Sequence, residues 1–501
     1  MVRQFFNRDL WGGSDRSPAE PGRLRRWRPT VAFWPALLTL VITLLGSDRA
    51  QLWRDELATW SAASRSTRDL LRLIGNIDAV FGPYYLLLHG WIRAFGDSVL
   101  ALRLPSVLAM AAAAGLTARL GERLFDARTG LIAGLLFAVA PSTSRYAQEA
   151  RPYALATFFA VLSTLLLVRS LARPSWRSWL GYAAAVAGLG LAHLVTITLI
   201  FGHAVAVPLV ERQEGRWLEW RRVGRWLTVV AVAGIVLAPL MLLGRSQHSQ
   251  QLEWVPRSTV WGLPGLPGAL LQTGVVGGML VGLAALGVAS RGRWGGVLGL
   301  FVLLPTALLF TAGLVMPLWV PRYLVFIVPF GCLLAAGALA PLRLRAALSI
   351  VVVVALAGAA AQVGLRRTHE WPRTQPIDYA AAAKIIGAGS QPGDGIVYEP
   401  RDGWKFLDLA IAYHLRDDRP DDLLATLDPI RRGDLWASEC AAPARCLASA
   451  DRVWLLVTGE RRDPLRGMSE PKRKALGNGF RVEQVWPVPG LTVALLIRRA
   501  S

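Results

Sequence analysis

The sequence predicts an α-helical polytopic membrane protein with a small α/β domain at its C-terminal end. Of the 501 residues, 53% are hydrophobic and only 18% are charged, whereas soluble proteins carry about 25% charged residues. The mean hydropathy is +0.39, and the apolar residues gather into blocks of roughly 17–25, long enough for a helix to cross a bilayer. After residue 364 this pattern stops, and helices alternate with shorter apolar strands.

Eleven apolar blocks predict eleven transmembrane helices. They lie near residues 31–47, 102–122, 129–142, 152–170, 178–194, 196–211, 226–244, 266–289, 295–315, 320–341 and 346–364. The segment 178–211 is long enough for one tilted helix, but a turn near His193 divides it into two spans. We prefer two spans because they place the arginine-rich loops on one side of the membrane, as the positive-inside rule requires.

The distribution of arginine orients these spans. The first 30 residues hold 7 arginines, and five predicted loops on the same side hold 3, 3, 5, 2 and 2. These loops are 119–128, 169–177, 211–225, 290–294 and 342–346. Cytoplasmic loops are enriched in Lys and Arg, which predicts a cytoplasmic N-terminus. No small-residue cleavage site follows the first span, so we expect an uncleaved helix rather than a signal peptide.

The formal net charge of +21 follows from the same distribution. Basic residues lie in short segments between apolar blocks, which indicates contact with anionic lipid headgroups. We therefore expect the lipid bilayer, and no nucleic acid, as a partner.

The chain accordingly divides into a cytoplasmic segment 1–30, a transmembrane domain 31–364 and, because the number of spans is odd, an extracytoplasmic α/β domain 365–501. The outer loop 48–101 carries DELATWSAAS and RSTRDLLRLIG, whose amphipathic spacing predicts helices in the plane of the membrane interface. The stretch PYYLLLHGWIRAFG, 83–96, carries charged and aromatic residues, which favours an interfacial or re-entrant helix.

The C-terminal domain shows a helical pattern in DYAAAAKIIGAG and strand patterns in GDGIVYEP, DRVWLLVTG and LTVALLIRR. This alternation is typical of a small α/β domain. Cys440 and Cys446 are close enough in SECAAPARC to form a disulfide, which would suit an extracytoplasmic location; two buried free thiols are the alternative. Cys332 lies within a span and is expected to be inert.

Several polar residues that adjoin the spans gather on the predicted outer side. They are Asp55, Glu56, Asp78, His89, Arg145, Glu149, Arg151, His193 and Arg322. Arginines near helix ends often serve as interfacial anchors, and a Glu beside an Arg often stabilises a loop. Their concentration on one face favours a functional site instead, because placing charged side chains at the membrane edge costs free energy and such residues are usually functional.

This combination of side chains suits one kind of chemistry. The planar guanidinium group of Arg binds phosphate oxygens, and a carboxylate in a low-dielectric cleft can act as general base toward a hydroxyl. Together they fit the transfer of a group from a lipid-linked phosphate to an alcohol outside the cytoplasm. The sequence contains no phosphate-binding glycine loop followed by Lys, no HExxH and no Cys/His zinc spacing.

Three stretches resemble one known family. WRDEL, GPYYLLLHGWIRAFGDSVLALRLPS and SRYAQEARPYAL resemble the bacterial protein-mannosyltransferase-like family of polyprenyl-phosphate-dependent glycosyltransferases (glycosyltransferase family 39), and PRYLVFIVP resembles a further segment. The likeness covers roughly residues 31–340. It implies the C-type membrane glycosyltransferase fold with about eleven transmembrane helices, a place in a bacterial plasma membrane, and a polyprenyl-phosphate sugar, with mannose as the first candidate, as donor.

The resemblance also implies roles for individual residues. Asp55 would be the catalytic base, with Glu56 alongside it. Glu149 would orient the acceptor or an arginine. Arg145, Arg151 and Arg322 would bind the donor phosphate.

Acceptor recognition departs from the family pattern. Many relatives have a histidine and paired prolines before the YYLLLH stretch, where this chain has DAVFGPYY. Asp78 would stand in for part of that pattern, and His89 and His193 are further candidates for acceptor binding.

The expected mechanism is a single displacement that inverts the anomeric carbon and needs no metal or other cofactor. The acceptor could be a glycan, a lipid or a secreted protein. Three alternatives stay open: a transporter or lipid flippase, a polymerase or ligase with a diphosphate-linked donor, and a non-catalytic assembly factor.

Overall fold

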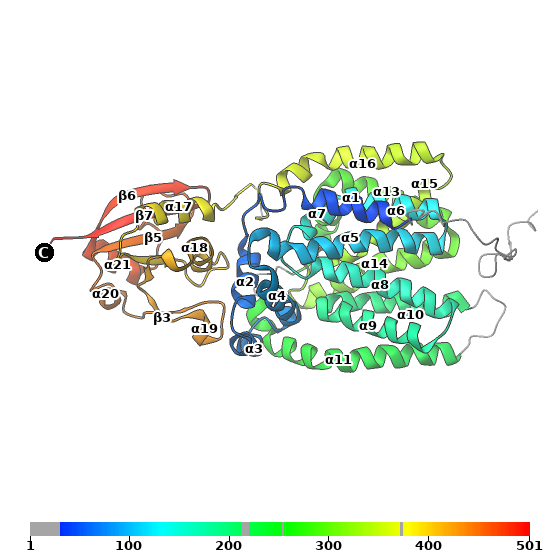
Figure 1. The fold of residues 1–501 in the computed structure, drawn as a ribbon, viewed down its shortest axis with the longest axis horizontal. Helices are drawn as coiled ribbons and strands as arrows, with labels where there is room; N and C mark the ends of the chain where they lie inside the picture. Colours follow the sequence, from blue (N-terminus) through cyan, green and yellow to red (C-terminus); the bar gives the residue numbers. More distant parts are fainter. Residues whose placement is uncertain (1–30, 212–219, 253–254, 256, 371–373, 501) are drawn as a thin grey trace, which may run out of the picture.

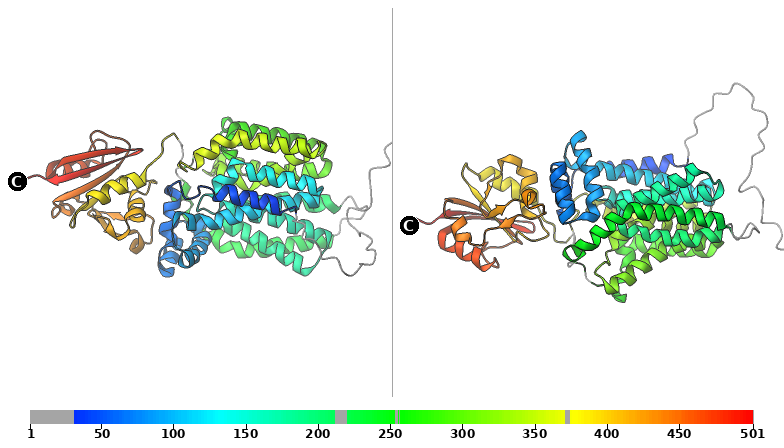
Figure 2. Two further views of the ribbon diagram at one scale, coloured as in Figure 1. Left: turned by 45° about the horizontal axis from the view of Figure 1, so that its top comes forward. Right: turned by 90° about the horizontal axis from the view of Figure 1, so that it is seen from below.

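The computed structural model describes residues 31–500 except for 212–219, 253–254, 256 and 371–373. A bundle of long helices is joined at one end to a smaller domain of helices and strands (Figure 1). A layer of short helices lies between these two parts (Figures 1 and 2). This arrangement confirms the predicted helical membrane domain with a C-terminal α/β domain.

The bundle contains a helix at each of the predicted spans. These helices are α1 (Phe33–Leu44), α5 (Val99–Leu124), α6 (Ala127–Val139), α8 (Tyr153–Ala172), α9 (Trp176–Ala192), α10 (Leu199–Glu211), α11 (Trp220–Leu252), α13 (Gly274–Ser290), α14 (Gly292–Val315), α15 (Val328–Leu339) and α16 (Leu344–Leu365). Among the described residues, 6 stretches are long and apolar enough to cross a membrane. The protein is therefore a multi-pass membrane protein, and eleven crossings stay a prediction.

Apolar residues cover the outside of the bundle as well as its core. Ile235 and Leu242 on α11 are 73% and 70% exposed, and Leu356 on α16 is 69% exposed. Many large apolar side chains on the outside of long helices are typical of a surface that lipid, rather than water, surrounds. The hydrophobic exterior thus agrees with the membrane location.

Small residues let neighbouring helices of the bundle approach closely. A Cβ added at Gly130 on α6 would collide with the backbone of α5 at Ala118 and Glu122, and one added at Gly121 on α5 would lie 2.7 Å from Gly130 Cα. Because apolar burial gains little in lipid, close backbone packing of this kind is a main source of helix association in membranes.

The outer layer consists of α2 (Arg54–Ala63), α3 (Thr67–Asn76), η2 (Ala79–Phe81) and α4 (Gly82–Phe95). These helices confirm the helical patterns of the loop 48–101. In α2, Leu57, Ala58 and Ala62 are buried and α18 of the C-terminal domain packs on this helix, so protein covers it, and its location in the plane of the membrane interface stays a prediction. α4, in contrast, leaves Leu86 and Leu87 exposed.

Shorter helices interrupt the bundle near the same end. They are α7 (Pro141–Ala147), η3 (Leu194–Thr198), η5 (Val260–Gly262), α12 (Leu266–Leu271) and η6 (Pro321–Ile327). The span predicted at 266–289 is broken at Gln272, whose φ of 67° ends α12. The turn predicted near His193 is confirmed, because α9 ends there and η3 follows.

The C-terminal domain is built on a five-stranded sheet of order β2-β1-β5-β7-β6. Its elements are α17 (Tyr379–Gly389), β1 (Gly395–Glu399), α18 (Leu407–Leu415), η7 (Arg416–Asp418), β2 (Asp421–Asp422), β3 (Ala425–Leu427), α19 (Pro429–Arg432), β4 (Ser438–Glu439), α20 (Pro443–Cys446), β5 (Arg452–Thr458), α21 (Glu470–Gly479), β6 (Phe480–Val488) and β7 (Leu491–Arg498). β1 runs parallel to β2 and β5, whereas β7 runs antiparallel to β5 and β6.

The three predicted strands correspond to β1, β5 and β7, and the sequence analysis missed β6. Cys440 and Cys446 form the predicted disulfide, and Cys332 is free and buried in α15.

The C-terminal domain is attached to the outer layer by polar contacts. Asp97, just before α5, accepts hydrogen bonds from Trp60 Nε1 at 2.8 Å and from Arg416 at 2.7 Å. Arg65, just after α2, donates to the carbonyl oxygen of Asp434 at 2.6 Å, and Asn76 donates to that of Gly433 at 3.1 Å. The outer layer is therefore held from both sides.

Candidate active site

A cavity of about 930 Å³ lies where the bundle, the outer layer and the C-terminal domain meet. Its described lining residues are Arg54, Asp55, Ala58, Asp78, Val80, Phe81, Arg151, His193, Leu194, Val195, Ile197, Thr198, Phe201, Met241, Gly244, Arg245, Met316, Leu318, Arg322, Tyr323, Trp404, Phe406 and Leu435. Charged side chains thus share one space with a long apolar wall from η3, α10 and α11.

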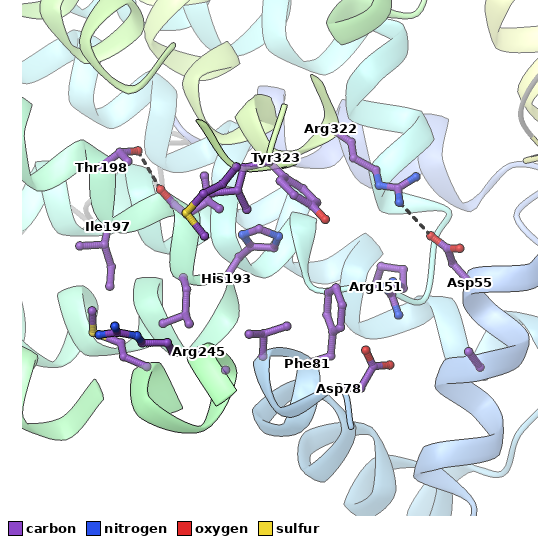
Figure 3. Close-up of a pocket in the computed structure, with 18 of the residues that line it drawn as sticks. Asp55, Asp78, Phe81, Arg151, His193, Ile197, Thr198, Arg245, Arg322 and Tyr323 are labelled. Carbon is purple, nitrogen blue, oxygen red and sulfur yellow. Dashed lines mark hydrogen bonds and ion pairs between the residues drawn. The ribbon is translucent and has the colours of Figure 1, made fainter. Parts of the chain in front are cut away.

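Asp55 enters this cavity from the first turn of α2. Its Oδ2 lies 3.4 Å from Nη2 of Arg322 (Figure 3), and the two side chains are 18% and 20% exposed. Arg322 comes from the start of η6, so residues 267 positions apart in the chain form the pair. The ion pair keeps a carboxylate and a guanidinium group together at the surface of the cavity.

Glu56, the neighbouring carboxylate, points away from the cavity into a buried network. It accepts hydrogen bonds from Arg103 Nε at 2.8 Å and Nη2 at 2.6 Å, and from the backbone N–H of Ala150 at 2.8 Å. Burial alone would raise the pKa of Glu56, but Arg103 and His369 outweigh it and hold the pKa below its ordinary value. The structure therefore separates Glu56 from Asp55 and gives it the contacts of a structural anchor.

Arg151 and Asp78 line the cavity beside Asp55 (Figure 3). Arg151 Nη1 lies 3.2 Å from Thr59 Oγ1, and its guanidinium carbon lies 3.9 Å from the centre of the Phe81 ring. Asp78 accepts a hydrogen bond from Tyr85 OH at 2.7 Å. Burial raises the pKa of Asp78, partly offset by the positive charge of Arg151.

Arg145 and Glu149 form a second buried pair behind the cavity wall. Arg145 Nη1 lies 3.1 Å from Glu149 Oε2, and its Nη2 donates to the carbonyl oxygen of His369 at 3.1 Å. Burial raises the pKa of Glu149, and Arg145 offsets only part of that increase. Neither residue lines the cavity. The indole of Trp53 lies between this buried pair and the Asp55–Arg322 pair of the cavity. The guanidinium carbons of Arg145 and Arg322 lie 4.9 and 5.9 Å from its ring centre.

The two candidate histidines lie in different places. His193 lines the cavity, with its ring 4.6 Å from that of Tyr323 (Figure 3). His89 lies outside the cavity lining, where its ring nitrogens contact Thr67 Oγ1 at 3.1 Å and the carbonyl oxygen of Ala63 at 2.9 Å. The contacts of His89 are those of a residue that joins α4 to the α2–α3 turn.

The sequence analysis missed several residues of this region. Arg245, near the end of α11, lines the cavity, and its place directly after the predicted span 226–244 was an available signal. Arg103, inside a predicted span, has its side chain fully buried and was detectable as a charge in an apolar block. Nothing in the sequence pointed to Trp404, Phe406 and Leu435, which reach the cavity from the distant C-terminal domain.

In the part of the chain that the structure describes, no group of three or more His, Cys, Asp or Glu side chains is arranged to hold a metal ion.

Comparison with known proteins identifies this architecture. Residues 83–242 match the family model described as dolichyl-phosphate-mannose-protein mannosyltransferase. The matched segment begins in α4 and ends within α11, so it contains Arg145, Glu149, Arg151 and His193. A search of curated proteins gave no match.

Solved structures with similar folds cover almost the whole chain. ArnT from Cupriavidus metallidurans in the apo state is 15% identical, with a TM-score of 0.60 over 92% of this chain and 97% of ArnT. The same protein bound to undecaprenyl phosphate is 16% identical, with a TM-score of 0.62 over the same shares. The arabinofuranosyltransferase AftD from Mycobacteria is 17% identical, with a TM-score of 0.51 over 93% of this chain and 40% of AftD.

These findings confirm the resemblance that the sequence motifs indicated. The chain has the C-type membrane glycosyltransferase fold, and its residues 83–242 match the model of the dolichyl-phosphate-mannose-protein mannosyltransferase family.

Proposed function

We propose that this protein is a membrane glycosyltransferase that moves a sugar from a polyprenyl-phosphate donor to an acceptor hydroxyl on the extracytoplasmic face. The observation that carries the proposal is the shared cavity, in which the Asp55 carboxylate faces the guanidinium groups of Arg322 and Arg151. The family match and the fold of ArnT, solved with undecaprenyl phosphate, support the same donor class.

A polyprenyl-phosphate donor has an apolar chain and a charged phosphate, and the cavity has a surface suited to each. Its apolar wall contains Ile197, Phe201, Met241 and Leu318. This wall suits the polyprenyl chain, because apolar groups are more stable where they are shielded from water. The phosphate would then lie among the arginines, whose charge does not titrate and whose fork matches phosphate oxygens. Arg322 and Arg151, which line the cavity beside Asp55, are the proposed phosphate ligands.

Asp55 is the proposed general base. It takes the proton of the acceptor hydroxyl while the acceptor oxygen forms a bond to the anomeric carbon of the sugar. The bond between this carbon and the phosphate oxygen breaks in the same step, and the arginines stabilise the charge of the leaving phosphate. One displacement inverts the configuration, so a β-linked donor, mannose being the first candidate, gives an α-glycoside.

The other acidic and basic candidates take supporting roles in this proposal. Glu56 fixes α2 through Arg103 and so positions Asp55. Arg145 and Glu149 hold the wall behind Trp53. Asp78 and His193 are placed to contact the acceptor or the sugar, because both line the cavity, whereas His89 supports α4.

The test is a transfer assay with purified protein in nanodiscs and radiolabelled polyprenyl-phosphate mannose, with extracts of bacterial membranes and cell walls as acceptors. We compare the wild type with Asp55→Asn and with Asp48→Asn, a control at an exposed position of the same outer loop. The proposal requires transfer by the wild type and the control, and no transfer by Asp55→Asn with donor binding retained.

Two other results would change the proposal. Transfer that survives in Asp55→Asn would assign the base to another carboxylate. If no polyprenyl-phosphate sugar supports transfer, the protein is reconstituted into sealed liposomes and tested for lipid flipping, since a transporter is the leading alternative.

A further inference from the structure

An aromatic cluster of the C-terminal domain forms part of the cavity wall. It consists of Trp404, Phe406 and Trp436. The rings of Phe406 and Trp436 are stacked with their centres 5.3 Å apart, and the ring of Trp404 stands edge-on to Trp436 at 4.9 Å. Trp404 and Phe406 line the cavity that also contains Asp55. The cluster therefore belongs to the same site, although it comes from a different domain.

The backbone holds this cluster in an unusual conformation. Phe406 has a φ of 48°, a left-handed conformation that is rare for a bulky residue and that proteins retain mainly at functional positions. Its side chain is only 2% exposed, whereas Trp404 keeps 38% of its surface exposed. Trp436 Nε1 donates to the carbonyl oxygen of Gly403 at 3.4 Å, which fixes the loop that carries Trp404. The result is one partly exposed indole on a rigid support.

The position of the cluster separates it from the proposed donor site. The C-terminal domain lies beyond the end of the helical bundle, past the outer layer (Figures 1 and 2). The apolar wall suited to a lipid chain comes instead from η3, α10 and α11 within the bundle. A molecule that reaches Trp404 therefore lies on the acceptor side of Asp55.

The chemistry of this wall also narrows the class of acceptor. The described lining residues from the C-terminal domain are Trp404, Phe406 and Leu435, none of which is charged. Polar groups begin at the adjoining α2, where Arg54 and Asp55 line the cavity. A surface with an apolar aromatic face and a polar edge suits a molecule that is itself apolar on one face and polar at its rim. A sugar ring, with C–H groups on its face and hydroxyls around it, has this character.

We propose that Trp404 is an acceptor-binding residue, on which a neutral sugar ring of a glycan acceptor stacks with one hydroxyl directed toward Asp55. This inference rests on the proposed glycosyltransferase function and specifies its acceptor as a carbohydrate. The C-terminal domain then selects the acceptor, while the membrane domain binds the donor.

The experiment measures three reactions of the full-length protein in nanodiscs with radiolabelled polyprenyl-phosphate mannose. The acceptors are oligosaccharides from a mild-acid digest of bacterial envelope polysaccharide, a threonine-rich peptide, and water alone, which reports slow donor hydrolysis. The variants are Trp404→Ala, Trp404→Phe and the control Trp261→Ala, which removes a tryptophan that is 87% exposed and does not line the cavity.

We expect Trp404→Ala to raise the KM for the oligosaccharides by about tenfold, the size of one aromatic contact. Donor KM and donor hydrolysis should stay at wild-type values. Trp404→Phe should have an oligosaccharide KM close to that of the wild type, because it keeps an aromatic face. Trp261→Ala should have the wild-type KM for the oligosaccharides.

Two outcomes would overturn the inference while leaving the glycosyltransferase function intact. One is transfer to the peptide and not to the oligosaccharides. The other is an oligosaccharide KM that is unchanged in Trp404→Ala. Failure of the proposed function itself would appear separately, as absence of both transfer and donor hydrolysis in the wild type.

Discussion

Two adjacent carboxylates in the first turn of α2 have opposite surroundings. Asp55 lies at the cavity surface beside Arg322, whereas Glu56 has its side chain fully buried against Arg103. Successive residues of a helix point about 100° apart, so the two carboxylates face different sides of α2. The repulsion expected between neighbouring acids is avoided because each has its own arginine.

Arg103 is expected to be the main anchor of the outer loop. Besides Glu56, it donates to the carbonyl oxygens of Ser47 at 2.6 Å and Ala50 at 2.8 Å. Arg103→Met would leave the Glu56 carboxylate buried without its partner, which costs about 3–5 kcal/mol in proteins. We expect a clear drop in the thermal unfolding temperature of the detergent-purified protein. Arg119→Met, at the more exposed pair with Glu122, serves as control and should change it little.

Asp408 in α18 is expected to make the stability of the C-terminal domain depend on pH. Burial raises the pKa of Asp408 to about 6, although Arg401 partly opposes the rise. The folded state therefore holds this proton more tightly than the unfolded state, and stability falls as pH rises from about 4 to about 6. Asp408→Asn should remove this fall, which amounts to about 3 kcal/mol at most. Urea unfolding at pH 4.5 and 7 checks it, and equal pH dependence in variant and wild type would contradict it.

At the scale of elements, helix packing depends on small residues and outer-layer geometry depends on contacts from two sides. α5 and α6 pack through Gly121 and Gly130, and α2 lies between the bundle and the C-terminal domain. The local sequence of α2 predicted a helix at the membrane interface. The helix is confirmed, and the structure adds that its apolar residues are buried and that α18 packs on it, which the local sequence did not predict.

Gly130→Leu is expected to disrupt the contact between α5 and α6. Any side chain at this position meets the backbone of Ala118 and Glu122, which cannot move as a flexible side chain can. We expect the free energy of unfolding to fall by more than about 3 kcal/mol, at the upper end for overpacked positions. The measurement is size-exclusion chromatography, in which the variant should lose its monodisperse peak. Gly278→Leu on α13, where an added Cβ meets nothing within 4 Å, should purify normally.

At the scale of the whole molecule, the α/β domain is at one end of the bundle and the connection between α15 and α16 is at the other (Figure 1). Arg343 lies in that connection and Arg345 in the first turn of α16, and both belong to the loop 342–346 predicted to be cytoplasmic. The predicted orientation thus places the cavity and the C-terminal domain on one side of the membrane and this basic loop on the other.

Single-cysteine labelling in intact cells tests the orientation. We expect Lys474→Cys, on α21 of the C-terminal domain, to react with a membrane-impermeant maleimide from outside. Arg343→Cys should react only after the cells are permeabilised. Cys332 is buried, and Cys440 and Cys446 form a disulfide, so the native cysteines should react little with the maleimide. The opposite labelling pattern would reverse the topology and place the site in the cytoplasm.

Removal of divalent metals should leave transfer unchanged. The proposed mechanism assigns the charge of the leaving phosphate to arginines, so it requires no metal ion. Transfer rates before and after treatment with EDTA, with and without added Mg²⁺ or Mn²⁺, measure this. A loss of activity that metal restores would show that the arginines are insufficient.

The sequence by itself determined the local properties of this protein. Apolar blocks gave the helices of the bundle, short apolar runs gave β1, β5 and β7, and the motifs around Asp55 and Arg151 indicated the family. These features depend on residues close together in the chain, where periodicity and composition are direct signals.

Only the tertiary structure decided which candidates share a cavity. It brought Asp55 to Arg322, turned Glu56, Arg145 and Glu149 away from the cavity, and added Arg245 and Trp404. β6 was missed because its strand pattern is interrupted by Pro487, and its pairing with β7 is what defines it. Contacts between distant segments depend on how whole helices and domains pack, and no local pattern of residues records that packing.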